Sequence, residues 1–271
     1  MKLPVFPNLG NTCYLSCVLQ SLLHSKGFVE NLNGLETPLA KELIKICKFI
    51  DNNNDGVHNA VLYNIKDLIN LIPFKKYEQQ DAHECILYFL DNLENENIYK
   101  LFHGKTETCF HCLRCGTNKM AVEPFNSINL TIPIKTSNVV ELFKDYLEPE
   151  KFLEENLYSC DTCNDLTQYE KKTSLYLLPD VLIIVLKRYT FTGAKLNSEV
   201  HFGSEIKVRE TLSGIVKEYQ LKSVINHSGN LFNGHYTNFL HENMWLFIDD
   251  EKVKPGKCVI DNAYILFYEI K

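Results

Sequence analysis

No long run of lysine and arginine occurs in this 271-residue sequence, and its formal net charge is −6. Direct nucleic-acid binding uses a basic patch or stripe and is therefore not expected. The sequence also has no apolar stretch long enough to span a bilayer and no N-terminal segment of the signal-peptide type. We therefore expect a protein of the cytoplasm or the nucleus that contacts no membrane.

Internal repeats, low-complexity tracts and linker-like segments are also missing, so nothing in the sequence separates independently folding modules. Hydrophobic residues make up 45% of the chain and charged residues 23%, which is the balance of a globular protein with a sizeable buried core. We therefore predict a single domain over residues 1–271.

The hydrophobic periodicity changes after about residue 103. Up to that point apolar residues recur at helical spacing, which predicts a helical lobe. From residue 104 onward, short β-rich runs predict a sheet-dominated lobe. The expected helices span residues 12–24, 38–50, 57–71, 79–93 and 139–152. The expected strands span residues 125–132, 172–177, 181–189, 219–227, 235–241, 244–248 and 263–269, and a polar loop that carries cysteines is expected over 154–168.

Ten cysteines in a reducing compartment indicate thiols, metal ligands or a nucleophile rather than a disulfide framework. Cys13 falls in the first turn of the first expected helix, where the helix dipole and free backbone N–H groups favour a thiolate. Cys13 is therefore a candidate nucleophile, although a buried core cysteine is the commoner role. We assign that core role to the cysteines in apolar or helical patterns, which are Cys17, Cys47, Cys85 and Cys258.

A nucleophilic cysteine needs a base, and His235 is the candidate among nine histidines. Gly234 precedes it and an alternating run follows, which places His235 at the mouth of a strand with room for a substrate. The next strand ends in Asp249 and Asp250, and either carboxylate could orient the imidazole. Taken alone, these residues are also compatible with a surface histidine and a solvated turn.

Two CxxC pairs are a strong metal-binding signal, because each tight knuckle can supply two corners of a tetrahedral zinc site. The pairs are Cys112 with Cys115 and Cys160 with Cys163. Cys109 also forms a CxxC with Cys112, so spacing alone leaves the first pair ambiguous. Four thiolates leave no open coordination position, which predicts one zinc ion with a structural role.

Two long segments resemble the defining boxes of the ubiquitin-specific protease family. The segment NLGNTCYLSCVLQ at residues 8–20 is similar to the cysteine box, and GHYTNF at 234–239 followed by WLFIDD at 245–250 is similar to the histidine box. Residues 79–84 and 178–189 extend the similarity. The resemblance therefore covers essentially the whole chain, which is identified as a member of this family.

The resemblance implies an α+β fold of the papain-like cysteine protease type. A helical thumb would cover residues 1–103, and a β-rich palm with zinc-bearing β fingers would cover residues 104–271. By position, the family pattern also favours Cys112 and Cys115 over Cys109 as zinc ligands.

The same resemblance implies a set of catalytic roles. Cys13 would attack the carbonyl of the C-terminal glycine of ubiquitin, and His235 would carry the proton. Asp249 would orient the imidazole, and Asp250 would be a second acid that assists. Asn8 matches the family's oxyanion-hole side chain, and a neutral amide can donate to a developing oxyanion.

Four further residues match substrate-binding positions of the family. Asp81 and Glu84 would pair with arginines of the ubiquitin tail, and Tyr189 and Tyr236 would line the channel for that tail. A channel walled by rings admits a Gly-Gly terminus and rejects bulkier side chains. Without the resemblance, the acids are typical of a solvated helix start and the rings are typical of a core.

The implied activity is hydrolysis of the isopeptide or peptide bond after the C-terminal glycine of ubiquitin, so ubiquitin and ubiquitinated proteins are the expected partners. The domain has little room for accessory modules, so we expect regulatory proteins to direct it to its targets. A catalytically silent ubiquitin-binding scaffold is an alternative, as is a protease for a ubiquitin-like modifier. The paired CxxC knuckles disfavour a different Cys-His-Asp enzyme.

Four positions depart from the family pattern. Ser16 and Cys17 replace the usual Asn and Ser after the nucleophile. Cys85 replaces a common aromatic residue or leucine, and Asn238 stands where a small residue is frequent. None of these departures removes a candidate catalytic group.

Overall fold

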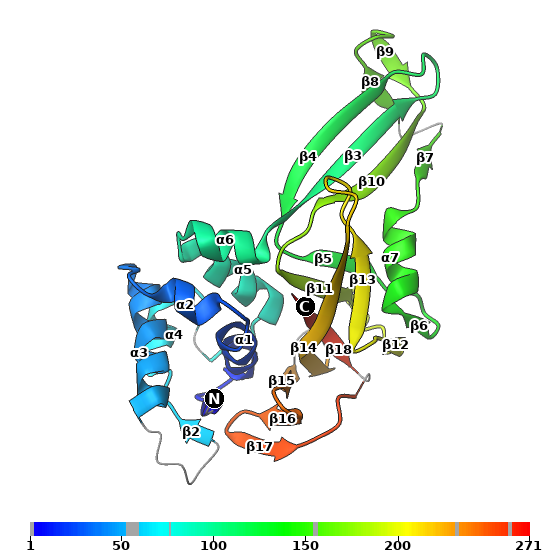
Figure 1. The fold of residues 1–271 in the computed structure, drawn as a ribbon. Coiled ribbons are helices and arrows are strands. Elements are labelled where there is room, and N and C mark those ends of the chain that lie inside the picture. The colour runs from blue at the N-terminus through cyan, green and yellow to red at the C-terminus, as the bar shows by residue number, and fades with distance from the viewer. Residues whose placement is uncertain (1–2, 53–59, 76, 154–156, 231–232, 260–261) are drawn as a thin grey trace.

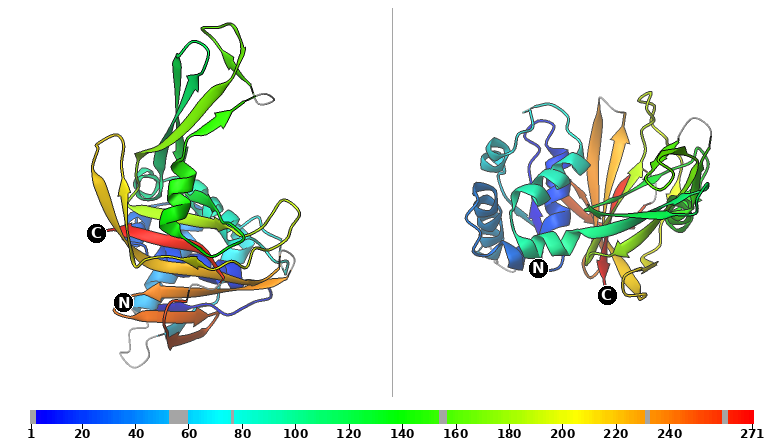
Figure 2. Two further views of the ribbon diagram at one scale, coloured as in Figure 1. Left: turned by 90° about the vertical axis from the view of Figure 1, so that its right-hand side faces the viewer. Right: turned by 90° about the horizontal axis from the view of Figure 1, so that it is seen from above.

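The computed structural model describes residues 3–52, 60–75, 77–153, 157–230, 233–259 and 262–271. It has three parts, which Figure 1 shows: a helical lobe, a central sheet beside it, and a narrower sheet that projects away from both. Seen from above in Figure 2, the N-terminal helices lie on one side and the sheets on the other. Residues 57–59 of an expected helix and 154–156 of an expected loop lie outside the described residues.

The helical lobe surrounds α1 (Cys13–Leu23), whose residues are all buried. A helix without a solvated face has to be covered on every side, and α1 packs against α5 (Ala82–Asn92) as well as strands β14 (Val216–Gly229) and β15 (Gly234–His241). The other elements of the lobe are β1 (Leu3–Val5), α2 (Phe28–Leu32), α3 (Pro38–Asn52), β2 (Ala60–Leu62), α4 (Lys66–Leu71) and α6 (Glu96–Phe102). Within the described ranges, no helix is long and apolar enough to cross a membrane.

Two expected helices of this lobe differ from the structure. The helix expected over 57–71 is wrong in part, because residues 60–62 form β2 and only residues 66–71 are helical. Strand β2 forms by parallel pairing with β1, a distant partner that local periodicity cannot reveal. The helix expected from residue 79 begins at Ala82, because Asp81 caps it with its side chain.

The central sheet has the strand order β17-β16-β15-β14-β18-β11-β5, and β13 pairs with β14 beside this path. All pairs are antiparallel except β11 with β5, which is parallel. The strands not yet given are β5 (Ile128–Thr131), β11 (Val181–Lys187), β13 (Glu205–Arg209), β16 (Trp245–Asp249), β17 (Lys252–Pro255) and β18 (Ala263–Ile270).

Strand β11 divides the hydrophobic core into two parts. Its alternate residues Val181, Ile183 and Val185 pack into a cluster with the helical lobe. Its intervening residues, Leu182, Ile184 and Leu186, pack into a second cluster that includes helix α7 (Val139–Leu147). Successive side chains of a strand point to opposite faces, so this nearly continuous apolar run is buried on both faces, as the sequence predicts.

The projecting sheet has the order β4-β3-β10-β7, and a separate hairpin, β8-β9, lies at its far end (Figure 1). Its strands are β3 (Gly104–Cys112), β4 (Asn118–Phe125), β7 (Glu150–Phe152) and β10 (Tyr169–Leu177), and the hairpin is β8 (Tyr158–Cys160) with β9 (Asp165–Thr167). Two short strands, β6 (Ser137–Asn138) and β12 (Val200–His201), pair with each other near α7.

The sequence did not predict most of this projecting sheet. Strands β3 and β4 were not expected, the helix expected over 139–152 ends at Leu147 before β7, and the expected loop over 154–168 contains β8 and β9. Strand β4 is exposed along most of its length and β3 and β10 are mostly half-buried, and none of them shows the regular alternation of apolar and polar residues that marks a strand on a core. Backbone pairing holds them instead: β3 forms a hairpin with β4 and also pairs with β10, which is distant in the sequence.

Replacing Ile184 by Ala should destabilise the domain by about 2–5 kcal/mol, because the side chain is completely buried in β11 and its loss leaves a cavity. Ile134→Ala is the matched control, since Ile134 is 88% exposed and its loss should change stability by no more than about 0.5 kcal/mol. Urea unfolding of both variants measures the difference. Equal stabilities would show that β11 is not part of the core described above.

Candidate active site

The loop before Cys13 is held by its own side chains. Asn8 Oδ1 accepts hydrogen bonds from the backbone N–H groups of Gly10 (3.1 Å) and Thr12 (3.2 Å), and Thr12 Oγ1 accepts one from Leu9 N–H (2.9 Å). Gly10 has a φ of 97°, a left-handed conformation that glycine adopts without strain. This loop leads directly into the first turn of α1, where Cys13 lies among backbone N–H groups that have no partner within the helix.

His235 and Asp249 come from neighbouring strands of the central sheet. His235 Nε2 lies 2.7 Å from Asp249 Oδ1. The antiparallel register of β15 and β16 ends at the pair Asn238–Ile248, and Asp249 follows Ile248 directly. Side chains alternate along a strand, so Asp249 and His235 both lie on the face opposite to that pair. The hairpin therefore brings the carboxylate to the imidazole.

The pKa of His235 is raised to about 9. The largest cause is its hydrogen bond with Cys13, the bond to Asp249 acts in the same direction, and partial burial opposes both. Because Asp249 occupies Nε2, the nitrogen that faces Cys13 is Nδ1. An imidazolium held between a carboxylate and a sulfur is the arrangement that supports an attacking thiolate.

Asn8 and Asp250 are bonded to each other. Asn8 Nδ2 donates to Asp250 Oδ2 at 3.0 Å, while the Asn8 carbonyl oxygen is occupied by the loop. Partial burial raises the pKa of Asp250, and its bond to Asn8 acts against this. An amide nitrogen carries two hydrogens, so Asn8 can donate to Asp250 and still offer one N–H. Of the two acids between which the sequence did not choose, Asp249 bonds to His235 and Asp250 bonds to Asn8.

Asp81 lies at the start of α5, where its carboxylate already has three partners. Oδ1 accepts from the backbone N–H groups of His83 (2.7 Å) and Glu84 (3.1 Å), and Oδ2 accepts from the Tyr264 hydroxyl (2.7 Å). The carboxylate is partly exposed, whereas Glu84 projects into solvent. Asp81 therefore combines a helix cap with a fixed negative charge beside the sheet.

A row of rings runs from the end of β11 across the sheet towards Asp81. The Tyr189 hydroxyl lies 2.9 Å from His227 Nδ1, the ring centroids of His227 and Tyr236 are 4.5 Å apart, and those of Tyr236 and Tyr264 are 6.3 Å apart. We call these four residues the aromatic wall. Burial lowers the pKa of His227 to about 4, with nearby Lys195 acting in the same direction, so this imidazole is neutral.

The structure brings the sequence-predicted residues into one region, but their exposure differs. Tyr189 is partly exposed, while Tyr236 is buried and packs inside the wall. Sequence reasoning missed His227 and Tyr264. His227 faces Tyr236 in the pairing of β14 with β15, and the Tyr264 hydroxyl donates to Asp81. No local pattern reveals either contact.

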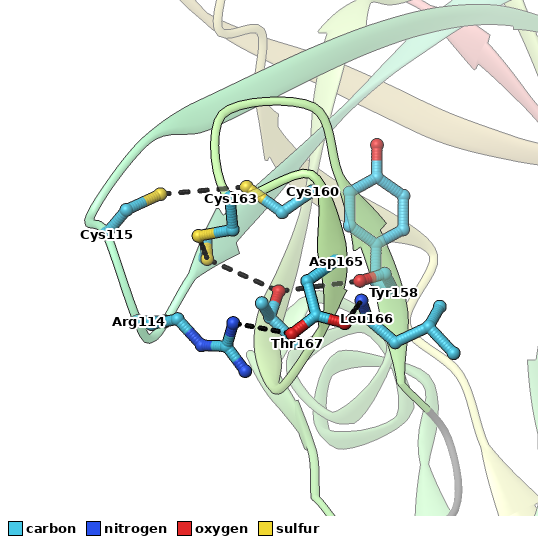
Figure 3. A network of polar contacts seen from close by, with 9 residues as sticks. Arg114, Cys115, Tyr158, Cys160, Cys163, Asp165, Leu166 and Thr167 are labelled. Atoms are coloured by element: carbon cyan, nitrogen blue, oxygen red, sulfur yellow. Dashed lines mark hydrogen bonds and ion pairs between the residues drawn. The ribbon is translucent and has the colours of Figure 1, made fainter.

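The second group of interest is the four-cysteine cluster at the end of the projecting sheet (Figure 3). Cys112 Sγ lies 3.9 Å from Cys163 Sγ, and Cys115 Sγ lies 3.6 Å from Cys160 Sγ. Zinc binds thiolates at about 2.3 Å, so a tetrahedral site needs sulfur atoms about 3.8 Å apart. These four sulfurs therefore fit a zinc ion.

Neighbouring contacts hold the cysteine cluster together. Arg114, between the first two cysteines, makes a 2.7 Å ion pair with Asp165 of the β8–β9 hairpin, as Figure 3 shows. Thr167 Oγ1 lies 3.3 Å from Cys112 Sγ. Cys109 lies earlier in β3, opposite Met120, and is not among the four clustered sulfurs. Geometry thus agrees with the choice of pairs that the family resemblance favours.

A family model described as "Ubiquitin carboxyl-terminal hydrolase" matches residues 6–268. The chain belongs to this family. It is 29% identical to the probable ubiquitin carboxyl-terminal hydrolase 8 of Schizosaccharomyces pombe, over 96% of this chain and 63% of that protein. It is 28% identical to ubiquitin carboxyl-terminal hydrolase 17-like protein E of Mus musculus, over 96% of this chain and 54% of that protein. The chain thus spans between half and two thirds of the length of these two relatives.

A plant relative is matched over most of its own length. Ubiquitin carboxyl-terminal hydrolase 4 of Arabidopsis thaliana is 28% identical, over 97% of this chain and 92% of that protein. These relatives confirm the family that the cysteine and histidine boxes indicate.

Two solved structures of the SAGA DUB module contain a chain of the same fold. In the module of Ubp8, Sgf11, Sus1 and Sgf73 bound to ubiquitin aldehyde, the similar chain has a TM-score of 0.80. In the module bound to monoubiquitin, the TM-score is 0.82. In each case the identity is 24%, over 98% of this chain and 69% of the other. The likeness confirms the expected α+β fold, in which the helical lobe is the thumb, the central sheet the palm and the projecting sheet the fingers.

The contacts of His235 predict its titration. In the unmodified protein, the imidazole should titrate with a midpoint of about 9 by NMR. Cys13→Ala and Asp249→Asn each remove a group that stabilises the imidazolium, so each should lower the midpoint towards the ordinary value of about 6.5. Cys47→Ala, which changes a cysteine on α3, should leave it unchanged. A midpoint that stays near 9 without Cys13 would contradict the contact.

Proposed function

We propose that this chain is the catalytic domain of a thiol-dependent deubiquitinase, which hydrolyses the isopeptide or peptide bond after the C-terminal glycine of ubiquitin. The observation that carries the proposal is the convergence of Cys13, His235 and Asp249 in a member of the ubiquitin carboxyl-terminal hydrolase family. The domain would comprise a thumb over residues 1–103 and a palm with fingers over residues 104–271, acting as one catalytic unit.

The reaction follows from these three side chains. The Cys13 thiolate attacks the glycine carbonyl, and the His235 imidazolium gives its proton to the departing amine as the C–N bond breaks. A water molecule then loses a proton to His235 and attacks the thioester, which releases the glycine carboxyl group and restores Cys13. Asp249 keeps the imidazole oriented and stabilises its charged form throughout.

The oxyanion of each tetrahedral intermediate needs hydrogen-bond donors that are fixed in advance. Asn8 is suited to this role, because Asp250 binds one of its amide hydrogens and the loop binds its carbonyl oxygen. The orientation of the remaining N–H is thereby set. The backbone N–H groups at the start of α1 are further donors beside Cys13.

The tail of ubiquitin would run past the start of α5 and the exposed end of the aromatic wall. Asp81 and Glu84 offer negative charge to arginines of the tail, and Tyr189 presents the partly exposed ring of the wall. At the base of the fingers, a hollow of about 560 Å³ lies between β3, β10 and α7 and could receive part of the ubiquitin body. The solved structures of Ubp8 contain ubiquitin aldehyde or monoubiquitin, which supports this class of partner.

We also propose that Cys112, Cys115, Cys160 and Cys163 bind one zinc ion with a structural role. Four thiolates complete the tetrahedral shell and leave no position for water or substrate. The finger strands are exposed or only half-buried along most of their length, so the ion would supply folding free energy to this part of the molecule.

Location and regulation are proposals of the same kind. A protein of the cytoplasm or nucleus fits an activity on ubiquitinated proteins, without direct contact with nucleic acid or membrane. In the solved structures, Ubp8 is part of a module with Sgf11, Sus1 and Sgf73. By analogy, protein partners would direct this domain to its targets.

Replacing Cys13 by Ala should abolish hydrolysis of a fluorogenic amide at the ubiquitin C-terminus, while ubiquitin binding remains measurable by titration. The reason is that the change removes the nucleophile but leaves the tail channel intact. Cys258→Ala, at a cysteine outside the site, should keep full activity. An inactive unmodified protein that still binds ubiquitin would favour the silent scaffold, and preference for a ubiquitin-like tail would favour the modifier protease.

Purified protein should contain about one zinc ion per chain, as expected for a single tetrahedral four-thiolate site. Cys160→Ser should lower the zinc content and the thermal unfolding temperature together, whereas Cys109→Ser should change neither. Elemental analysis and thermal unfolding measure the two quantities. Full zinc content in Cys160→Ser would refute the ligand set.

A further inference from the structure

Among the described residues, no strand pairs with one edge of β15 where it approaches the active site. The pairs between β15 and β16 run from Asn238 to His241, so they begin after the residues around His235. At this edge the helical lobe supplies the partners instead. Gln79 binds the backbone of Gly234, and Tyr236 N–H donates to Cys13 Sγ at 3.5 Å. Two groups of the thumb thus bind backbone groups on either side of His235.

Gln79 binds Gly234 as a neighbouring strand would. Its Nε2 donates to the Gly234 carbonyl oxygen at 2.7 Å, and its Oε1 accepts from the Gly234 N–H at 2.9 Å. A side-chain amide can match both groups at once because it has the same donor and acceptor as a peptide unit. The residue immediately before His235 is therefore held in position by both its polar atoms.

The same side chain also reaches the loop that precedes the nucleophile. Gln79 Nε2 lies 3.3 Å from Asn11 Oδ1, and Asn11 Nδ2 donates to the Tyr77 carbonyl oxygen at 2.7 Å. Asn11 is two residues before Cys13. Gln79 therefore contacts the segment that carries the base and the segment that carries the nucleophile.

Gly234 is confined from its other side by His227. A Cβ atom at position 234 would lie 2.0 Å from His227 Nε2 and 2.8 Å from the Ser228 carbonyl oxygen. Position 234 therefore has to be glycine. By itself, however, a glycine restricts the backbone less than any other residue does. The bidentate bond to Gln79 compensates for this freedom at the position next to His235.

We propose that Gln79 is a positioning residue for the proposed hydrolysis: by holding the Gly234 peptide, it fixes the start of β15 so that His235 meets Cys13. The inference rests on the proposed function for its kinetic consequences only. The contact between His235 and Cys13, which Gln79 would maintain, does not depend on the substrate. Without Gln79, the peptide would bond to water and the start of β15 would lose its fixed register against the thumb.

The neighbouring residue Gln80 gives a matched control. Its Nε2 lies 3.3 Å from the Lys75 carbonyl oxygen, within the thumb. Gln79→Met and Gln80→Met remove the amide while keeping a side chain of similar length. Gln79→Glu and Gln80→Glu keep the shape, but at position 79 a carboxylate oxygen replaces the donor to Gly234. Two variants at each position allow a conclusion even if one variant at position 79 does not fold.

The kinetic experiment uses the full chain and a fluorogenic amide at the ubiquitin C-terminus. In both Gln79 variants kcat should fall on the order of 10-fold to 100-fold, because misplacement of a catalytic group by a fraction of an ångström slows the chemical step. KM should change by less than about twofold, since the side chain does not bind the tail. Both Gln80 variants should keep the kcat and KM of the unmodified protein.

NMR titration of His235 is the measurement that a merely structural role would not affect. In the Gln79 variants, the midpoint should move from about 9 towards the ordinary value, because the hydrogen bond with Cys13 is its largest cause. Unchanged kcat and an unchanged midpoint in a folded Gln79 variant would overturn the proposal. A lower kcat that accompanies only a lower unfolding temperature, with the midpoint still near 9, would also overturn it.

The two proposals fail in different ways. If the unmodified protein does not cleave the ubiquitin amide, the proposed function fails, but the titration of His235 still decides the role of Gln79. If the unmodified protein is active and the Gln79 variants match the Gln80 variants, the positioning role fails while the function stands.

Discussion

Helix α1 docks on β14 and β15 in such a way that Cys13 Sγ meets the backbone N–H of Tyr236, 223 positions away in the sequence. A buried polar network fixes this contact. Asn238 Nδ2 donates to Ser21 Oγ (3.1 Å) and to Ser223 Oγ (2.9 Å), and the two hydroxyls lie 2.8 Å apart, so α1 is bonded to both strands. Hydrogen bonds inside a core have strict geometry, and their loss is costly. The asparagine that departs from the family pattern therefore has a structural partner on the nucleophile's helix.

The remaining parts of the site are arranged around this contact. The β15–β16 hairpin adds Asp249 behind the imidazole, and Asp250, one residue later, turns to the other side and binds Asn8. Successive residues at a strand end can serve different partners because their side chains diverge. The two adjacent acids thus bind two different groups: Asp249 binds the base, and Asp250 binds Asn8, the candidate donor to the oxyanion. The same turn positions both carboxylates.

The fingers depend less on apolar burial than the rest of the molecule does. Their strands are exposed or only half-buried, and the sheet extends away from both core clusters, so these strands bury less apolar surface than those of the central sheet. For the same reason, strands β3 and β4 left no clear pattern in the sequence, whereas β11 with its two buried faces was predicted. The four cysteines, the strand expected over 172–177 and the family resemblance marked this region in advance, and the cysteines did so because ligand spacing within a knuckle is a local property. The pairing of β1 with β2 escaped prediction because it joins segments that are far apart.

The sequence alone determined which reactive groups this protein has: a cysteine at a helix start, a histidine at a strand start, two adjacent acids and two cysteine knuckles. These are local features, in which residue type and short spacing already fix the chemistry. The sequence did not decide which acid bonds to His235, or that Gln79, His227 and Tyr264 lie around the site. Those choices depend on strand register and on the docking of α1, which joins residues more than two hundred positions apart. Only the packed tertiary structure brings such distant side chains within hydrogen-bonding distance.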